Sequence, residues 1–416
     1  MAYLVRAVDI ALDRLLPAMG AVLIEGARGC GKTSTGLEHA RSSLRLDSSP
    51  QLIELASLDP SALLAGESPR LIDEWQLAPT LWNVIRHEID DRQLRGQFIL
   101  SGSAAPAEEV TRHSGAGRIA RLRMRPMSLA ESQRSTREVS LAGLGQESHV
   151  SGTSALGYRD LAEEAVRGGW PALLTATPED AVTFNRSYVD DLCSSAIPLA
   201  TGVRHDPIRV RRLLQGVSRN LANEATLENL ARDVSADGGQ LTPTTVRTYL
   251  DALARVFALD ELPAWSVALR SRSRLRTSSK LHLADPALAC AALGVGAERL
   301  AGDPEFFGQV FEAMAIRDLR ALVSSEQGRI YHYRDNTGLE VDAVLEYPDG
   351  RWAAVEVKLG STRIADAEKS LVALRDHRVD LDRVGSPSFL AVVTGTQYAY
   401  TLPSGVHVIP LGVLGA

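Results

Sequence analysis

The sequence predicts an α/β protein with more than one domain, on three observations. Short apolar strands alternate with amphipathic helices between residues 21 and 131, which is typical of a parallel sheet covered by helices. Residues 158 to about 300 have mainly helical spacing, and residues 301–416 return to alternating strands and helices. The chain has 416 residues, more than one ordinary core holds, so we expect two to four domains.

The composition indicates a folded, soluble protein. Hydrophobic residues make up 45% and charged residues 23% of the chain, and the formal net charge is −6. This charge excludes a globally basic nucleic-acid-binding protein, although local basic patches remain compatible with it. Cys30, Cys193 and Cys290 lie far apart without a CxxC pair, which argues against disulfides or a zinc ribbon and for a reducing compartment.

No part of the sequence predicts insertion into a membrane. No apolar run reaches the roughly 18 residues that a membrane helix needs. The first 19 residues have Asp9, Asp13 and Arg14 inside their apolar pattern, which predicts an amphipathic helix rather than a signal peptide. We therefore expect a cytoplasmic protein without a membrane partner.

The N-terminal strands and helices follow in a regular order. Residues 21–40 ("AVLIEGARGCGKTSTGLEHA") predict an apolar strand, a Gly-rich turn and the start of a helix. A second strand ends in acids at 69–76, a helix follows at 81–94, and a third buried strand at 96–104. A further strand at 117–131 carries Arg121, Arg123 and Arg125 on one side, because alternate residues of a strand share a face.

The Gly-rich turn predicts a phosphate-binding loop. "GARGCGKT" fits G-x-x-x-x-G-K-[ST] at every fixed position. Such glycines let backbone N–H groups cradle a phosphate at a helix N-terminus. Lys32 is expected to contact the β- and γ-phosphates of ATP, and the Thr33 hydroxyl to ligate Mg²⁺. The expected nucleotide-binding residues are Gly26, Ala27, Arg28, Gly29, Cys30, Gly31, Lys32, Thr33 and Ser34.

Two acids at the end of the second strand extend this prediction to hydrolysis. "LIDE" places Asp73 and Glu74 at the carboxyl end, where open parallel sheets bind their ligands. Asp73 suits the second Mg²⁺ contact, and Glu74 suits the base that orients the attacking water. On the third strand, Ser101 and Ser103 are candidates for sensing the γ-phosphate or polarising the water; the alternative is ordinary turn residues.

The middle of the chain predicts a winged helix. Residues 225–262 indicate helix, turn, helix, with Thr242 as N-cap, Pro243 at the first helical position, and Arg247 on a recognition helix over 243–257. A basic stripe follows, which suits contact with DNA or RNA phosphates; the alternative is a solvated strand edge. The stripe consists of Arg270, Arg272, Arg274 and Arg276.

Near the C-terminus, "GLEVDAVLEYPDGRWAAVEVKLG" predicts a hairpin that brings charged groups together. Asp342 lies on its first strand, and Glu356 and Lys358 share a face of the second, with Val355 and Val357 in the core. Glu312, on the apolar face of an upstream helix, needs a partner or a metal. Two carboxylates on one Mg²⁺ with a nearby lysine is the arrangement of PD-(D/E)xK nucleases.

A structural ion pair between Glu356 and Lys358 is the alternative for this cluster. Glu340 lies two residues before Asp342 and is expected to share its face. No basic groove is evident around the cluster, only the scattered Arg334, Arg351 and Arg363, which weakens the case for cleavage of nucleic acid. A nuclease-type fold also does not fix nuclease activity.

Several contiguous motifs resemble known families. Residues 1–131 resemble the small AAA-type ATPase domain of the AAA_14 kind, through "LIEGARGCGKTS", "LIDEWQLAPTLWNVIRHEID", "FILSGSA" and "GRIARLRMRPMSL". Residues from about 158 to 370 resemble the DUF4143 region, through "GGWPALL", "TVRTYLDALARVFALDELPAW", "KLHLADPALA" and "GLEVDAVLE…AAVEVKLG". The resemblance implies a cytoplasmic ATPase followed by a winged-helix segment and a PD-(D/E)xK-type domain.

The AAA resemblance also implies an arginine supplied by a neighbouring subunit, which would neutralise charge in the transition state. Arg118, after a loop, and Arg86, on the helix at 81–94, are the candidates, and we prefer Arg118. An ordinary salt bridge is the alternative for each. This role predicts a homo-oligomer.

The expected domains are an ATPase domain at 1–135, a linker and helical segment at 136–205, a winged-helix-like segment at 206–300 and a nuclease-like domain at 301–416. The linker assignment follows from the Ser- and Gly-rich stretch at 133–157.

Two functions fit this organisation. One is an ATPase whose C-terminal domain acts on or binds nucleic acid, with Glu74, Lys32, Arg118, Ser103 and Lys358 as catalytic residues and Thr33, Asp73, Glu312, Asp342 and Glu356 as metal ligands. The other is a nucleotide-switched scaffold for a protein partner, with an inert C-terminal domain.

Overall fold

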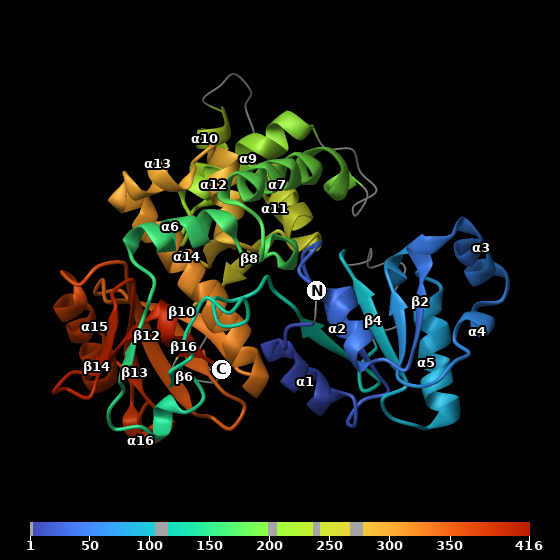
Figure 1. Ribbon diagram of the computed structural model, residues 1–416, viewed down its shortest axis with the longest axis horizontal. Helices are drawn as coiled ribbons and strands as arrows, with labels where there is room; N and C mark the ends of the chain where they lie inside the picture. The colour runs from blue at the N-terminus through green and yellow to red at the C-terminus, as the bar shows by residue number, and fades with distance from the viewer. Residues whose placement is uncertain (1–2, 105–114, 199–205, 236–241, 267–277) are drawn as a thin grey trace.

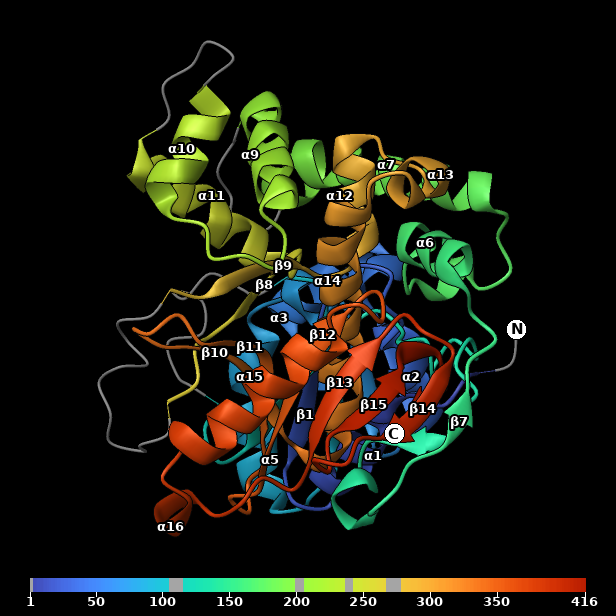
Figure 2. The same ribbon diagram turned by 90° about the vertical axis from the view of Figure 1, so that its left-hand side faces the viewer.

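The computed structural model describes residues 3–104, 115–198, 206–235, 242–266 and 278–416. Figure 1 shows an N-terminal α/β region, a helical region and a C-terminal α/β region. The view from the side shows the helical region stacked over the C-terminal sheet (Figure 2). The predicted fold class, a parallel sheet followed by helices and a second α/β region, is confirmed.

The N-terminal region is built on a five-stranded, fully parallel sheet in the order β2-β3-β4-β1-β5. Its strands are β1 (Ala21–Glu25), β2 (Ser42–Arg45), β3 (Arg70–Asp73), β4 (Phe98–Gly102) and β5 (Ile119–Arg123). Its helices are α1 (Ala7–Leu15), α2 (Lys32–His39), α3 (Pro50–Leu58), α4 (Pro60–Leu63) and α5 (Leu81–Arg92).

The central strands β1, β3 and β4 are buried on both faces, which explains why they are apolar without alternation, whereas the edge strands β2 and β5 are partly exposed. On β1, Val22 and Ile24 face a core that includes Leu12 of α1, whereas Leu23 faces a second core that includes Ile85 of α5. β4 lies between β1 and β3, so the strand that ends in acids is not the direct neighbour of the strand that leads into the Gly-rich turn. All parallel strands end at one edge, and that edge collects the candidate residues.

The helical region contains the segment expected to be a winged helix. Its helices are α6 (Tyr158–Arg167), α7 (Pro178–Asp191), α9 (Pro207–Arg219), α10 (Leu227–Ser235), α11 (Pro243–Arg255), α12 (Pro286–Leu293) and α13 (Ala297–Ala301). Thr242 caps α11 by accepting a hydrogen bond from the Thr245 N–H, as predicted. After α11, β8 (Leu259–Leu262) pairs antiparallel with β9 (Lys280–Leu283). Helices followed by a hairpin match the expected order, and the winged-helix assignment stays a prediction.

The C-terminal region contains a seven-stranded mixed sheet in the order β10-β11-β12-β13-β15-β14-β7, with β7 (Gly152–Thr153) contributed from earlier in the chain. Its strands are β10 (Arg329–Arg334), β11 (Glu340–Glu346), β12 (Trp352–Lys358), β13 (Leu390–Thr394), β14 (Tyr398–Thr401) and β15 (His407–Pro410), with the short β16 (Leu414–Gly415) beside it. Its helices are α14 (Pro304–Val323), α15 (Ile364–His377) and α16 (Leu381–Val384). The predicted hairpin joins β11 to β12, closed by the Tyr347 N–H donating to the Arg351 carbonyl at 2.9 Å.

The stretch expected to be a linker is packed against the C-terminal region. β6 (Val139–Ser140) pairs with β16, and β7 (Gly152–Thr153) pairs with β14 at the edge of the seven-stranded sheet. Leu141, Leu144 and Val150 are buried. Residues 133–157 therefore fix the chain to the C-terminal sheet, although their composition indicates a loop.

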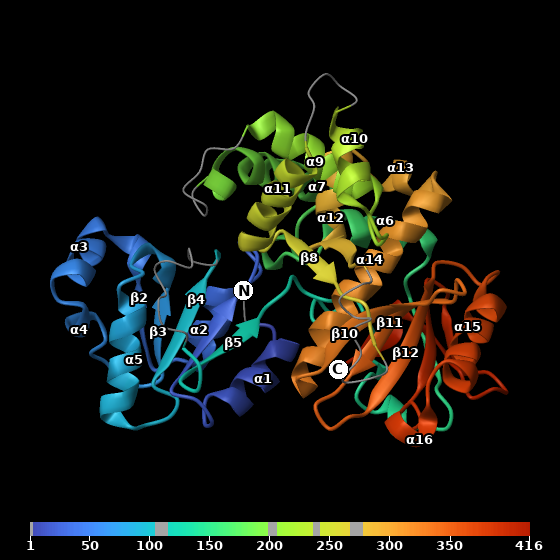
Figure 3. The same cartoon turned by 180° about the vertical axis from the view of Figure 1, so that it is seen from behind.

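The N- and C-terminal regions also touch each other directly. In Figure 3, α1 and β5 lie beside α14 and β10. The Arg14 Nη1 donates to the Ser325 carbonyl at 2.7 Å, in the turn after α14. None of the described helices is both long and apolar enough to cross a bilayer.

Candidate functional site

The Gly-rich loop between β1 and α2 has the backbone that phosphate binding requires. Gly29 and Gly31 have φ values of +76° and +108°, in the left-handed region that favours glycine. Gly26 lies against a neighbouring backbone, because an added Cβ would be 2.1 Å from the Met124 carbonyl oxygen. A loop with this backbone can turn its N–H groups towards a phosphate.

Lys32 and Thr33, the first residues of α2, are aimed at this loop and at β3. The buried Lys32 ammonium donates to the carbonyls of Gly26 and Ala27 at 3.0 and 2.9 Å. The Thr33 hydroxyl lies 3.0 and 3.1 Å from the two carboxylate oxygens of Asp73. A hydroxyl and a carboxylate in contact beside a phosphate cradle fit a Mg²⁺ ion, so the predicted ligand pair is brought together.

Asp73 and Glu74 end β3 with different surroundings. Asp73 is buried, accepts a hydrogen bond from Ser101 and lies 3.7 Å from Arg45 Nε. Glu74 has a left-handed backbone with φ of +54° and accepts hydrogen bonds from the Ser103 hydroxyl at 3.2 Å and from Gln76. The backbone turn points Glu74 away from the strand, where it is partly accessible.

A cavity of about 520 Å³ lies next to the loop and the start of α2. Gly31 and Ser34 line it, and residues from distant segments form other parts of its wall. These wall residues are mainly apolar and include Tyr3, Leu4, Met127, Pro171 and Leu174. The sequence did not identify them as site residues; the "GGWPALL" stretch was the only signal near them.

The predicted C-terminal charged residues also come together. Lys358 Nζ lies 3.1 Å from Asp342 Oδ2 and 2.5 Å from Glu356 Oε2. The Val357 N–H donates to Asp342 Oδ2 at 2.8 Å. Glu312 joins the cluster from α14, so three elements supply the four expected residues.

A second lysine, which the sequence did not identify, occupies the centre of this cluster. Lys280 begins β9 and is only 3% exposed. Its ammonium lies 3.1 Å from Glu312 Oε1, 2.9 Å from Glu340 Oε1 and 3.6 Å from Asp342 Oδ1. A tethered cation therefore sits where three carboxylates converge.

The acids of this cluster differ in the direction in which their pKa values are shifted. Burial raises the pKa of Glu312 to about 8, with the Asp342 carboxylate adding to the rise. Burial also raises the pKa of Asp342, but Lys358 and Lys280 outweigh it and bring the pKa down to about 2. Burial and the nearby Asp342 raise the pKa of Glu356 well above its ordinary value. Lysine pairing thus concentrates the negative charge on Asp342.

This arrangement differs from the expected metal site. Within the part of the chain that the structure describes, no three His, Cys, Asp or Glu side chains are placed to hold a metal ion. Glu312, Asp342 and Glu356 converge, but on ammonium groups. The donors suit a hard cation chemically, and the positions between them are taken by Lys280 and Lys358.

Comparison with known families follows the division of the chain. Residues 19–133 match the model of the AAA domain family AAA_14. The chain therefore contains an AAA domain. Residues 307–414 match DUF4143 and residues 158–299 match DUF8612, each described as a domain of unknown function. Both expected resemblances are confirmed, but DUF4143 covers the C-terminal region alone, and the stretch before it matches a separate family.

Two mycobacterial proteins are similar along almost the whole chain. They are the uncharacterized proteins Rv2008c of Mycobacterium tuberculosis and Mb2031c of Mycobacterium bovis. Each is 26% identical over 410 residues, which is 96% of this chain and 82% of the relative. The three regions therefore occur together in these relatives as well.

Two solved structures align with most of this chain at low similarity. The Walker-type ATPase PABY2304 of Pyrococcus abyssi aligns over 69% of this chain and 94% of its own, with 12% identity and a TM-score of 0.44. The Aeropyrum pernix ORC1 protein in complex with DNA aligns over 70% and 93%, with 12% identity and a TM-score of 0.25. At these scores, neither likeness bears on the function of this chain.

Both candidate arginine fingers of the AAA domain already have a side-chain partner, and Arg118 also lies away from the phosphate loop of its own chain. Arg118 precedes β5, and the register of Ala21 with Ile119 places it at the amino edge of the sheet, opposite the loop. It pairs with Asp90 at 2.6 Å. Arg86 on α5 donates to Asn83 at 3.1 Å. A finger role for Arg118 therefore requires a second chain.

The other predicted basic residues are spread over the surface. Arg247 pairs with Asp251 at 2.9 Å, Arg334 with Glu224 at 3.7 Å, and Arg351 with Asp349 at 2.6 Å. Arg363 is exposed before α15. The stripe from Arg270 to Arg276 lies outside the described residues. These residues form no single basic groove around the Asp342 cluster within the described ranges.

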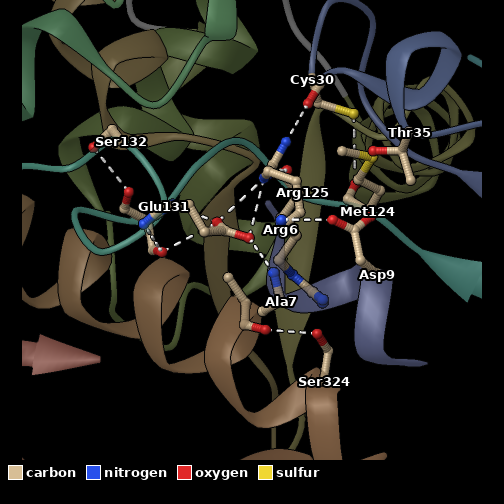
Figure 4. A network of polar contacts seen from close by, with 12 residues as sticks. Arg6, Ala7, Asp9, Cys30, Thr35, Met124, Arg125, Glu131, Ser132 and Ser324 are labelled. Atoms are coloured by element: carbon tan, nitrogen blue, oxygen red, sulfur yellow. Dashed lines mark hydrogen bonds and ion pairs between the residues drawn. The ribbon is translucent and has the colours of Figure 1, made fainter. Parts of the chain in front are cut away.

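A buried polar network, which the sequence did not indicate, links the phosphate loop to the rest of the chain (Figure 4). Arg6 donates to the Cys30 carbonyl in the loop at 3.0 Å and to the Arg125 carbonyl after β5 at 2.9 Å. Its Nε lies 3.0 Å from Glu131 Oε1. Glu131 also accepts from the Ala7 N–H at 2.9 Å. The loop is thereby held to α1 and to the segment that leaves the AAA domain.

Proposed function

We propose that this chain binds and hydrolyses ATP in its AAA domain. The observation that carries the proposal is the contact between Thr33 on the phosphate loop and Asp73 on β3. With ATP bound, Lys32 turns from the loop carbonyls to the β- and γ-phosphates, and the loop N–H groups hold the phosphate oxygens. Mg²⁺, when bound at Thr33 and Asp73, offsets charge on the phosphates.

Glu74 serves as the base that orients the attacking water. Its hydrogen bonds to Ser103 and Gln76 fix the carboxylate at the edge where the strands end. Ser101 holds Asp73 in place from β4, which lies between the two strands involved. The sequence-predicted roles of Glu74, Ser101 and Ser103 are consistent with these contacts.

The neighbouring 520 Å³ cavity suits the adenine base. Its volume falls in the range of about 300–1,000 Å³ that small-molecule sites occupy, and its apolar walls suit a flat aromatic ring. The cavity opens beside Gly31 and Ser34, at the start of the helix that follows the loop. A base held there leaves the phosphates within reach of the loop.

Binding and hydrolysis are tested separately. Fluorescent ATP binding and phosphate release are measured for the full chain, for Lys32→Ala and for Lys369→Ala, an exposed lysine on α15. We expect Lys32→Ala to lose both signals and Lys369→Ala to keep both. Wild-type protein that binds no ATP in the presence of Mg²⁺ contradicts the proposal.

We further propose that the C-terminal domain binds nucleic acid without cutting it. Lys280 between Glu312, Glu340 and Asp342 supports this choice over a metal-dependent nuclease, because an ammonium takes the place of the metal. The test incubates labelled DNA and RNA with the protein and with Mg²⁺ or Mn²⁺. Cleavage that is lost in both Asp342→Ala and Lys358→Ala, with ATPase activity retained, refutes it.

A nucleotide-switched scaffold is the second candidate function. The network from the phosphate loop through Arg6 and Glu131 supports it, because it reaches the end of the AAA domain, where the Leu129 N–H donates to Asp318 of α14. This function predicts ATP-dependent association with a protein partner that tolerates Asp342→Ala but not Lys32→Ala. Loss of that association in Asp342→Ala, with a normal melting curve, excludes it.

Arg118 is proposed to act in a neighbouring chain of a homo-oligomer. Its position at the edge opposite its own loop supports this, because only a second copy could present it to a nucleotide. The specific ATPase rate should then rise with protein concentration, and Arg118→Ala should remove that rise.

The three buried, unpaired thiols support a reducing compartment such as the cytoplasm.

A further inference from the structure

A cavity of about 720 Å³ lies between the AAA domain and the rest of the chain, separate from the phosphate loop and from the Asp342 cluster. α1 and β5 form one wall, and β8, the end of α14 and the start of β10 form the other. These elements face each other in Figure 3. The cavity thus lies between regions that are more than 100 residues apart in sequence.

The charged side chains that line this cavity are mainly arginines. Five arginines face two acids, Asp260 and Glu261 on β8. One acid is turned elsewhere, because Glu261 pairs with Arg247 at 3.9 Å. The arginines are Arg121, Arg123, Arg125, Arg320 and Arg329.

A single carboxylate, that of Asp260, pairs with two of the three inner arginines. Asp260 Oδ2 lies 2.9 Å from Arg125 Nε and 2.6 Å from Arg320 Nη1. Arg123 stacks over the Phe257 ring at 4.1 Å from its centroid instead. Burial lowers the pKa of Arg320 to about 10, and Arg125 and Arg123 act in the same direction, although Asp260 opposes them. The inner part of the cavity therefore has more positive charge than its own acids neutralise.

The two outer arginines extend this charge towards solvent. Arg121 is half-exposed and pairs with Glu25 at 3.0 Å. Arg329 is exposed at the start of β10, and within the described part of the chain its side chain has no hydrogen bond or ion pair. Guanidinium groups at several depths suit a ligand with more than one anionic group.

We propose that this cavity binds phosphate groups, with the Arg123–Arg125–Arg320 cluster holding one phosphate and Arg329 a second. Planar guanidinium groups match phosphate oxygens in pairs, and a partly dry site strengthens each contact. The phosphates belong either to a nucleic-acid backbone or to a small phosphate-bearing molecule. The site extends the proposed function by giving nucleic acid a place to bind, but it does not depend on ATP hydrolysis.

The cavity is also directly joined to the phosphate loop. Arg123 pairs in register with Glu25, the last residue before Gly26. The Met124 N–H donates to the Glu25 carbonyl at 2.8 Å, and the Met124 carbonyl packs on Gly26. A ligand that pulls on Arg123 therefore acts on the strand against which the loop rests.

The test measures phosphate binding in the full chain that carries Lys32→Ala as a background substitution. This substitution removes binding at the nucleotide site, so the signal comes from elsewhere in the protein. The probes are a fluorescein-labelled single strand, a labelled duplex and inorganic pyrophosphate. Arg329→Ala should weaken binding about tenfold, Arg329→Glu more strongly, and the slope of log affinity against log salt should fall by about 1. Arg375→Ala, an arginine on α15 outside the cavity, should bind as the background does.

Each outcome decides the matter. If the Arg329 variants lose binding of the oligonucleotides, the phosphates belong to a nucleic-acid backbone. If these variants lose binding of pyrophosphate alone, the phosphates belong to a small molecule. Unchanged binding in both Arg329→Glu and Arg123→Ala, or no binding of any probe, overturns the inference. Arg329 is exposed, so a folding defect is not expected, and far-ultraviolet circular dichroism checks this. ATPase activity of the otherwise unchanged protein separately tests the proposed function.

Discussion

Replacing Lys280 by Met tests whether a tethered ammonium replaces a metal in the C-terminal cluster. Met keeps the apolar stem and removes the charge. In the folded protein, the ammonium lies 2.9 Å from Glu340 and 3.6 Å from Asp342, at 3% exposure. Losing one partner of a buried ion pair costs about 3–5 kcal/mol.

The lower end of that range is expected for Lys280→Met. Glu312 has a pKa raised to about 8 by burial, so it holds a proton near pH 7 and needs no counter-charge. Asp342 keeps Lys358 at 3.1 Å. Glu340 is 41% exposed, so water compensates its charge. The uncompensated buried charge is therefore that of Asp342, and we expect a loss of about 3 kcal/mol, which is more than a hundredfold in a local opening equilibrium.

Hydrogen exchange followed by mass spectrometry measures this loss where it occurs. Peptides from β11 and β12 should lose protection in Lys280→Met and keep it in Lys369→Met, which removes an exposed lysine. A divalent cation at about 100 times its Kd should return about 2.7 kcal/mol to Lys280→Met, and nothing to the wild type. Equal protection in the two variants, or equal responses to Mn²⁺ in wild type and Lys280→Met, refutes the reasoning.

Three further changes test the AAA domain. Glu74→Gln should keep ATP binding but lower the hydrolysis rate by at least about a hundredfold, since it removes the base; an unchanged rate excludes that role. Gly26→Ala should cost about 1–3 kcal/mol, because its Cβ would meet a backbone carbonyl at 2.1 Å, whereas Gly308→Ala, where the space is open, should cost nothing. His39→Gln tests pH dependence: the hydrogen bond to Asp9 raises the pKa of His39, so its stabilisation is full below about pH 6.5 and lost as pH rises through the higher folded value. The melting temperatures of wild type and His39→Gln should converge at high pH, and a constant gap contradicts this.

Local patterns explain what the sequence could predict. The phosphate loop is contiguous, and its glycines are required by backbone conformations at Gly29 and Gly31. The pairing of Asp342 with Lys358 follows from one hairpin with a short turn, so spacing alone brings them together. In both cases, neighbours in sequence are neighbours in space.

Contacts between distant segments explain what it could not predict. Lys280 lies 32 positions before Glu312, and its strand β9 belongs to a different sheet from β11, which carries Asp342, so no spacing connects them. Tyr3 and Pro171 meet at the cavity beside α2 only through packing of the N-terminus against the segment after the AAA domain. The paired strands of residues 133–157 have two residues each, too few to produce a periodic pattern.

α14 connects the three candidate sites, which are the phosphate loop, the arginine cavity and the Asp342 cluster. It carries one residue that belongs to, or is linked to, each of them. Glu312 belongs to the Asp342 cluster, and Arg320 lines the arginine cavity. Between them, Asp318 accepts from the Leu129 N–H at 2.8 Å, two residues from Glu131, which Arg6 ties to the phosphate loop. Eight residues of helix span only about 12 Å. A rigid-body shift of α14 driven by the phosphate loop would therefore reach the arginine cavity and the acidic cluster together, so ATP-dependent changes in hydrogen exchange should appear at both or at neither.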